Sequence, residues 1–235
     1  MFLKSQIVFT LLFLLFSCTP SEETLMAESR KKMQSESYDE AIKYLNQVLS
    51  NNESNLDALN MRGVAHYQKE EYEEALNDFT NYINFDTTSY KPYYNRGNAH
   101  LALKNYESAL IDYNRAINLK PNDADLYINR GTALFELKQF QVAIEDNNFA
   151  IKLAPGNYLP YLNNAKTYIQ VGGFEKAKEL LESTLQLNPD NGEAYYWLGF
   201  IKINTGDTEG GCGELVKAKN RGFADANEAL EKFCK

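Results

Sequence analysis

The chain has 235 residues, of which 44% are hydrophobic and 13% aromatic, and its 24 basic and 32 acidic side chains give a formal net charge of −8. A protein that binds nucleic acid needs a basic face to neutralise phosphates, so this balance argues against a nucleic-acid partner. The length allows one or two domains with a sizeable core.

The N-terminal segment has the features of a secretion signal. Lys4 precedes an apolar run, residues 7–16, which is followed by Ser17 and Cys18. A run this short behind a positive charge is typical of a signal peptide, and it is too short for an ordinary membrane span. We therefore expect residues 1–17 to be a signal peptide.

The four residues that end at Cys18, Leu-Phe-Ser-Cys, resemble the bacterial lipobox, in which the cysteine is acylated and becomes the mature N-terminus. The resemblance implies lipidation of Cys18, for example by palmitate, and a lipidated polar tether over residues 18–24. Acyl chains contribute about 0.8 kcal/mol per buried methylene, so the anchor would be firm. The expected location is the bacterial cell envelope, and we favour the outer membrane. The alternative is an unmodified Cys18 in an uncleaved anchor.

Small, aromatic and proline residues recur along the rest of the chain with a period of 34 residues. The rows are Gly63, Gly97, Gly131, Ala165 and Gly199; Ala41, Ala75, Ala109, Ala143, Ala177 and Gly211; Tyr38, Tyr72, Tyr106, Phe140 and Phe174; and Pro121, Pro155 and Pro189. Each unit is predicted to form two helices that approach closely at the small residues. The aromatic residue fills space beside the turn, and the proline follows the second helix because it cannot continue a helix interior.

This pattern resembles the tetratricopeptide repeat over nearly the whole mature chain. The resemblance implies an all-α fold, a right-handed α-solenoid of about six helix-turn-helix units with a C-terminal capping helix. Ser29 replaces the glycine of the first unit and Thr208 the aromatic of the sixth, as expected for end units that face solvent on one side. The array is expected over 25–223, with units near 22–55, 56–89, 90–123, 124–157, 158–191 and 192–223, and the capping helix over 224–235.

Three units carry an arginine at their seventh position and an aspartate sixteen residues later. The pairs are Arg62 with Asp78, Arg96 with Asp112, and Arg130 with Asp146. The fifth unit has Asn164 and Leu180 instead, so both residue types are lost together. We favour an ion pair between the two helices of a unit, since guanidinium and carboxylate match in bidentate geometry. The alternative is an arginine row that binds an anionic ligand.

An asparagine recurs at the sixth position of three units, as Asn95, Asn129 and Asn163. In the tetratricopeptide-repeat family this position tends to face the concave groove. The row looks like the asparagine ladder of O-linked N-acetylglucosamine transferase, whose amides hold a peptide backbone. An amide donates and accepts hydrogen bonds, so it can bind a peptide without reading its side chains. The alternative is that asparagine is simply common at this position.

Further candidate peptide-binding residues in the inferred groove combine aromatic and polar side chains. They are Tyr94, Asn98, Lys166, Tyr196 and Trp197. The carboxylate clamp of some co-chaperones also uses asparagines, which Asn98 and Asn129 match, but the three cations of that clamp are missing here. Binding of a terminal carboxylate by that mechanism is therefore not expected.

The sequence offers no catalytic motif and no expected metal or cofactor. The two histidines, His66 and His100, share the eleventh position of consecutive units, where packing is the expected role. The glycine cluster 206–213 lacks the lysine of a phosphate loop and falls at the turn of the sixth unit. Cys212 and Cys234 straddle a turn, so they are expected either to form a disulfide outside the cytoplasm or to be two separate buried thiols.

These observations predict a non-catalytic, membrane-anchored scaffold that binds a protein or peptide on its concave face within an envelope assembly. A first alternative is a pilotin-like lipoprotein that escorts a subunit of an outer-membrane machine. A second is an accessory to a glycan-processing system.

Overall fold

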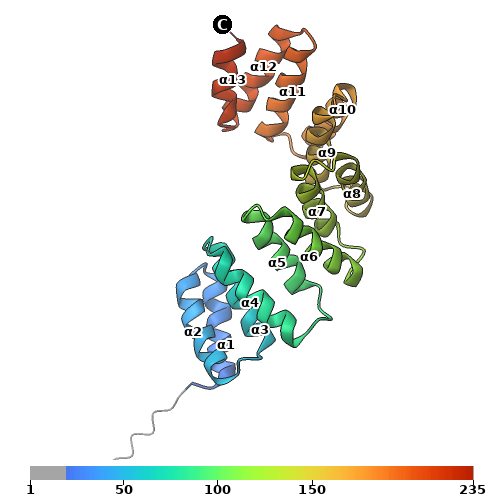
Figure 1. Ribbon diagram of the computed structural model, residues 1–235. Helices are drawn as coiled ribbons and strands as arrows, with labels where there is room; N and C mark the ends of the chain where they lie inside the picture. Colours follow the sequence, from blue (N-terminus) through green and yellow to red (C-terminus); the bar gives the residue numbers. More distant parts are fainter. Residues whose placement is uncertain (1–19, 235) are drawn as a thin grey trace, which may run out of the picture.

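The computed structural model describes residues 20–234, so the predicted signal peptide and Cys18 lie outside the described residues. Within the described part, all regular structure is helical (Figure 1). The helices are α1 (Glu22–Gln34), α2 (Tyr38–Asn51), α3 (Leu56–Gln68), α4 (Tyr72–Phe85), α5 (Lys91–Ala102), α6 (Tyr106–Leu119), α7 (Ala124–Glu136), α8 (Phe140–Leu153), α9 (Leu159–Gln170), α10 (Phe174–Leu187), α11 (Gly192–Asn204), α12 (Thr208–Asn220) and α13 (Asp225–Phe233).

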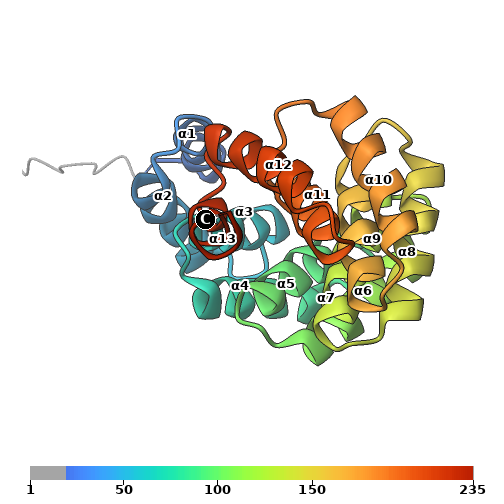
Figure 2. The same cartoon turned by 90° about the horizontal axis from the view of Figure 1, so that it is seen from above.

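Helices α1 to α12 form six helix pairs, each packed on the next along the chain. Helices α1 and α13 lie at opposite ends of the array (Figure 1). Seen along the axis of the array, the chain turns counterclockwise as it rises from α1 toward the viewer at α13, which makes the superhelix right-handed (Figure 2). The first helices of successive pairs, from α3 to α11, also pack against one another, so they form the concave inner face. The predicted all-α, right-handed solenoid is confirmed.

The two helices of every unit are joined by a turn whose central residue has left-handed backbone geometry. These residues, each at the fifteenth position of its unit, are Glu36, Glu70, Lys104, Lys138, Gly172 and Gly206. Backbone hydrogen bonds close the turn in the usual way for a helix C-terminus: the N–H of Glu36 donates to Met33 O and that of Ser37 to Lys32 O. Four of the six residues are not glycine, so the chain accepts local strain there.

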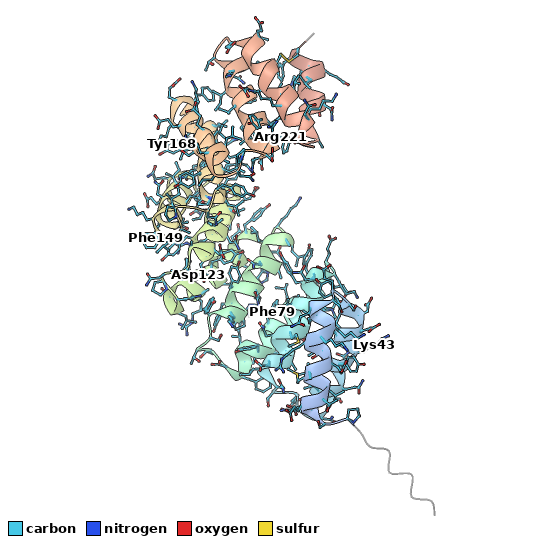
Figure 3. The ribbon with its side chains drawn as sticks, turned by 180° about the vertical axis from the view of Figure 1, so that it is seen from behind. Lys43, Phe79, Asp123, Phe149, Tyr168 and Arg221 are labelled. Carbon is cyan, nitrogen blue, oxygen red and sulfur yellow. A yellow bond between two sulfur atoms is a disulfide. The ribbon has the colours of Figure 1, made fainter. Side chains whose placement is uncertain are left out.

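Close packing within each unit depends on the small residue at its eighth position. A Cβ on Gly63 would lie 2.6 Å from the ring of Phe79, and a Cβ on Gly97 would lie 2.8 Å from the ring of Tyr113. Phe79 is 0% exposed inside the array, whereas Phe149 is 38% exposed at its outer edge (Figure 3). In the sixth unit the backbone of the second helix also comes close, since a Cβ on Gly199 would lie 2.9 Å both from the Leu215 side chain and from the carbonyl oxygen of Gly211.

The C-terminal helix α13 packs on α12 and α11 and closes the array. A disulfide joins Cys212 of α12 to Cys234, with their Cα atoms 5.8 Å apart. Between residues 20 and 234 the structure has no helix with the length and apolar character needed to cross a membrane.

Candidate peptide-binding groove

The three predicted arginine–aspartate pairs lie in contact, each linking the two helices of its unit. Arg96 donates from Nε to Asp112 Oδ2 at 2.9 Å and from Nη2 to Asp112 Oδ1 at 2.7 Å. Arg62 with Asp78 and Arg130 with Asp146 repeat this bidentate geometry. Their carboxylates are buried, so these guanidinium groups face inward and are not arranged as an anion-binding row.

Each of these arginines also binds the second helix of the preceding unit, a contact that was not predicted from the sequence. Arg62 Nη1 donates to Asn46 at 2.6 Å, and Arg96 and Arg130 donate to the corresponding Thr80 and Asn114. In the fifth unit Asn164 continues the row by donating to Asn148 at 2.9 Å. The signal was present in the sequence, because the acceptors Asn46, Thr80, Asn114 and Asn148 also recur every 34 residues.

The asparagine ladder lies on the first helices, and each amide donates to the preceding unit. Asn95 donates to Asn60 at 3.0 Å and Asn129 to Asn98 at 2.9 Å, while Asn163 makes a longer contact of 3.5 Å with Thr132. All three ladder residues are half-buried. Their side-chain oxygens have no protein donor among residues 20–234, so each can still accept a hydrogen bond. The ladder amides therefore link neighbouring units through their N–H groups and leave their oxygens free as hydrogen-bond acceptors.

Tyr94 and Asn98 form a cluster with the ladder residue Asn129, which donates to Tyr94 Oη at 3.3 Å as well as to Asn98. The Tyr94 ring lies 6.4 Å from that of Tyr113, and Tyr113 donates its hydroxyl proton to Asn98 at 2.8 Å. Burial raises the pKa of Tyr94, so its hydroxyl stays protonated. Asn98 thus accepts from both Tyr113 and Asn129, and only its N–H groups are free for a ligand.

Lys166 and Trp197 meet at a shared carboxylate. Glu193 of α11 lies 2.8 Å from Lys166 Nζ and accepts a 3.2 Å hydrogen bond from Trp197 Nε1. This contact ties α9 to α11 on the concave side of the array. Both side chains stay partly exposed, so they can still contact a ligand.

Tyr196, which was predicted to contact a peptide, lies against the C-terminal cap. Its ring lies 5.0 Å from that of Phe223, and it forms a small pocket with Ala229 and Phe233 of α13. The pKa of Tyr196 is raised by burial and by the negative charges of nearby Asp225 and Glu228. Helix α13 takes the place of a following first helix here, and Tyr196 stays partly exposed beside it.

The histidines serve local contacts. His66 Nδ1 lies 2.6 Å from Glu71 beside the turn of its unit. His100 is partly buried, and its Nδ1 has no partner among residues 20–234. Burial lowers the pKa of His100. In the described part of the chain, no three His, Cys, Asp or Glu residues gather in a way that would hold a metal.

Family models match most of the repeat array. Residues 26–83 and 162–201 match a model described as tetratricopeptide repeat, and residues 97–138 match one described as TPR repeat. The chain carries tetratricopeptide repeats. A search of curated proteins finds no match.

Solved structures share the fold of these repeats at low identity. A crystal structure of MamA is 24% identical with a TM-score of 0.65, over 68% of this chain and 94% of that one. A tetratricopeptide repeat protein from Parabacteroides merdae is 19% identical with a TM-score of 0.70, over 91% of this chain and 84% of that one. YrrB, described as a TPR protein with an unusual peptide-binding site, is 18% identical with a TM-score of 0.63, over 80% of this chain and 97% of that one.

Proposed function

We propose that this repeat protein is a membrane-anchored scaffold that binds a protein or peptide segment in its concave groove, within an assembly of the cell envelope. The observation that carries the proposal is the ladder of Asn95, Asn129 and Asn163, whose side-chain oxygens have no donor within the described part of the chain. An extended peptide needs acceptors for its N–H groups, and such a ladder supplies them at regular intervals. The peptide-binding site described for YrrB is consistent with this use of the fold.

The ladder is preorganised for such a ligand. The amides of Asn95 and Asn129 are held by hydrogen bonds to the preceding unit, so their orientation is set before a peptide arrives. Less side-chain freedom is lost on binding, which favours affinity. The mechanism is reversible recognition with no chemical step. The membrane part of the proposal rests on the apolar run 7–16 and on Cys18.

Affinity capture from membranes of the source cells tests the proposal. The bait is compared with a variant that carries Asn95→Ala, Asn129→Ala and Asn163→Ala together. A matched control replaces three exposed asparagines on second helices, Asn77, Asn84 and Asn118, by alanine.

We expect the control to capture the same partner as the native chain and the ladder variant to lose most of it. Retained capture by the ladder variant would contradict the proposal. Loss by both variants would assign the effect to stability, which the melting temperature checks. Capture of a single outer-membrane machine subunit would favour the escort alternative.

A further inference from the structure

One unit departs from the others at the residue that packs under its small eighth position. That residue is Phe79, Tyr113, Leu181 and Leu215 in the second, third, fifth and sixth units. In the fourth unit it is Asn147, on α8 beneath Gly131 of α7. Asn147 is 1% exposed, so a polar side chain is buried where its counterparts are aromatic or aliphatic.

The amide of Asn147 is fixed in one orientation. Its Nδ2 donates to the carbonyl oxygen of Ala143 at 2.9 Å, and a flipped amide would instead oppose two oxygens there. Within the described residues Oδ1 has no hydrogen-bond partner. A buried carbonyl oxygen without a donor is unfavourable, so this acceptor needs a group that can reach it.

Asn147 lines a cavity of about 50 Å³ between α7, α8 and α9. One water needs roughly 10–15 Å³, so the cavity has room for a small group rather than a single water. The cavity adjoins the groove, because the ladder residue Asn163 and Lys166 also line it. The remaining lining residues are Thr132, Phe135, Glu136 and Thr167, beside Gly131.

The lining is rich in acceptors. The hydroxyl protons of Thr132 and Thr167 are donated to the carbonyl oxygens of Ile128 and Asn163, at 3.0 and 2.8 Å. Both hydroxyls keep a lone pair for an occupant, although Thr132 also accepts the 3.5 Å contact from Asn163, and Glu136 adds a carboxylate. Asn147, whose buried Oδ1 is unpartnered within the described residues, also lines the cavity. The single cation, Lys166, is neutralised by Glu193 at 2.8 Å.

We propose that this cavity, the Asn147 pocket, takes the ammonium end of a lysine side chain. An ammonium has three donors and no acceptor, which matches the lining. It is also compact enough for the cavity, whereas the planar guanidinium of arginine is larger. This proposal rests on the proposed function, since the lysine would belong to the peptide that the ladder holds. It would add side-chain selectivity to a groove that otherwise binds backbone.

The pocket is tested first with n-butylammonium, which mimics the end of a lysine side chain and needs no peptide binding in the groove. In the purified ¹⁵N-labelled chain, the Asn147 side-chain amide signals are identified by their loss in Asn147→Leu. We expect n-butylammonium to shift them with a Kd on the order of 1–10 mM, as befits so small a ligand. Butyrate and n-butanol serve as the anionic and neutral controls.

The variant Lys166→Ala tests whether the cavity favours a positively charged ligand. Removing this cation should tighten n-butylammonium binding severalfold, because the Glu193 carboxylate is then left near the site without its partner cation. Weaker binding to Lys166→Ala, equal shifts with butyrate or n-butanol, or no shift up to about 100 mM n-butylammonium would each overturn the proposal. An absent shift would leave a bound water as the partner of Asn147.

A decapeptide library that places lysine or norleucine at each position then tests whether a peptide bound in the groove inserts a lysine into the pocket. Norleucine keeps the aliphatic stem without the ammonium. We expect the native chain to enrich lysine about tenfold at one position, and Asn147→Leu to lose that preference while still capturing peptides. Leucine suits this site, since Leu181 and Leu215 occupy it in neighbouring units.

The two proposals fail in different ways. If the native chain captures no peptide, the proposed function fails, and the n-butylammonium result alone decides the pocket. If peptides are captured with no lysine preference, or if the preference survives in Asn147→Leu, the pocket is rejected and the scaffold function stands.

Discussion

Arg96 and Asp112 form a bidentate ion pair between α5 and α6, in which Asp112 is only 2% exposed. Arg96→Ala would leave that carboxylate buried without its partner. We expect the free energy of unfolding to fall by about 3 kcal/mol, measured by urea denaturation. The double variant Arg96→Asn with Asp112→Leu copies Asn164 and Leu180 of the fifth unit and should recover most of the loss. A stable Arg96→Ala protein that no longer captures its partner would instead favour a ligand-binding arginine row.

Gly97→Ala tests the close approach of α5 and α6. The new methyl group would lie 2.8 Å from the Tyr113 ring, and Tyr113 is 0% exposed, so the ring has little room to move. We expect a loss of about 1–3 kcal/mol in urea denaturation. Adding Tyr113→Leu, which reproduces Ala165 and Leu181 of the fifth unit, should restore part of it. Gly156→Ala meets no atom within 4 Å and is the control, expected near wild type.

Lys138→Gly is expected to stabilise the chain. Lys138 has a φ of 59° at the turn of its unit, a conformation that glycine adopts without the steric cost of a Cβ. We expect a gain of about 1 kcal/mol in the free energy of unfolding. The reciprocal change, Gly172→Ala at the equivalent turn with a φ of 77°, should cost a similar amount. Equal stability of all three proteins would show that the turn carries no strain.

His100 makes stability depend on pH. Burial lowers its pKa below the ordinary value of 6.5; the negative charge of Asp112 opposes this shift and Arg96 adds to it. The unfolded chain therefore binds a proton more readily than the folded one. Stability is fully present above pH about 6.5 and is lost as the pH falls through the folded-state pKa. His100→Leu, which copies Leu134, should show a smaller loss between pH 7 and 5 in urea titrations. Parallel curves for the two proteins would contradict this.

Breaking the Cys212–Cys234 disulfide should release the cap and leave the rest of the array folded. The bridge spans 22 residues, for which loop-closure entropy gives roughly 3 kcal/mol. Repeat units depend mainly on their neighbours, so the effect should stay local to α12 and α13. We expect the double serine variant to be cleaved faster by trypsin near Arg221, and reductant to change the electrophoretic mobility of the native chain. An unchanged mobility would indicate separate thiols.

The 34-residue rows were enough to place the helices, because small and aromatic residues at fixed positions dictate how two helices pack. The expected unit starts at 56 and 124 coincide with the first residues of α3 and α7. The turn geometry at Glu36 and Lys138 could not be read from residue type, since neither glutamate nor lysine signals a left-handed backbone.

The site was less predictable than the fold because it depends on contacts between units. Asn95 and Asn129 were recognised by position, but their bonds to Asn60 and Asn98 require the curvature of the array. Tyr196 occupies a groove position by sequence and lies against Phe223 and α13 because the array ends there. The unpartnered oxygen of Asn147 likewise emerges only when its surroundings are assembled.

The row of hydrogen bonds from each first helix to the preceding second helix stops before the last unit, and this has a mechanical consequence. Asn164 is the last donor, since Leu198 occupies the corresponding place in α11. The α10–α11 junction is also the least extensively packed contact between successive units. Under tension along the superhelix, we expect this junction to part first. A single-molecule pulling trace whose first rupture releases any other unit would contradict that order.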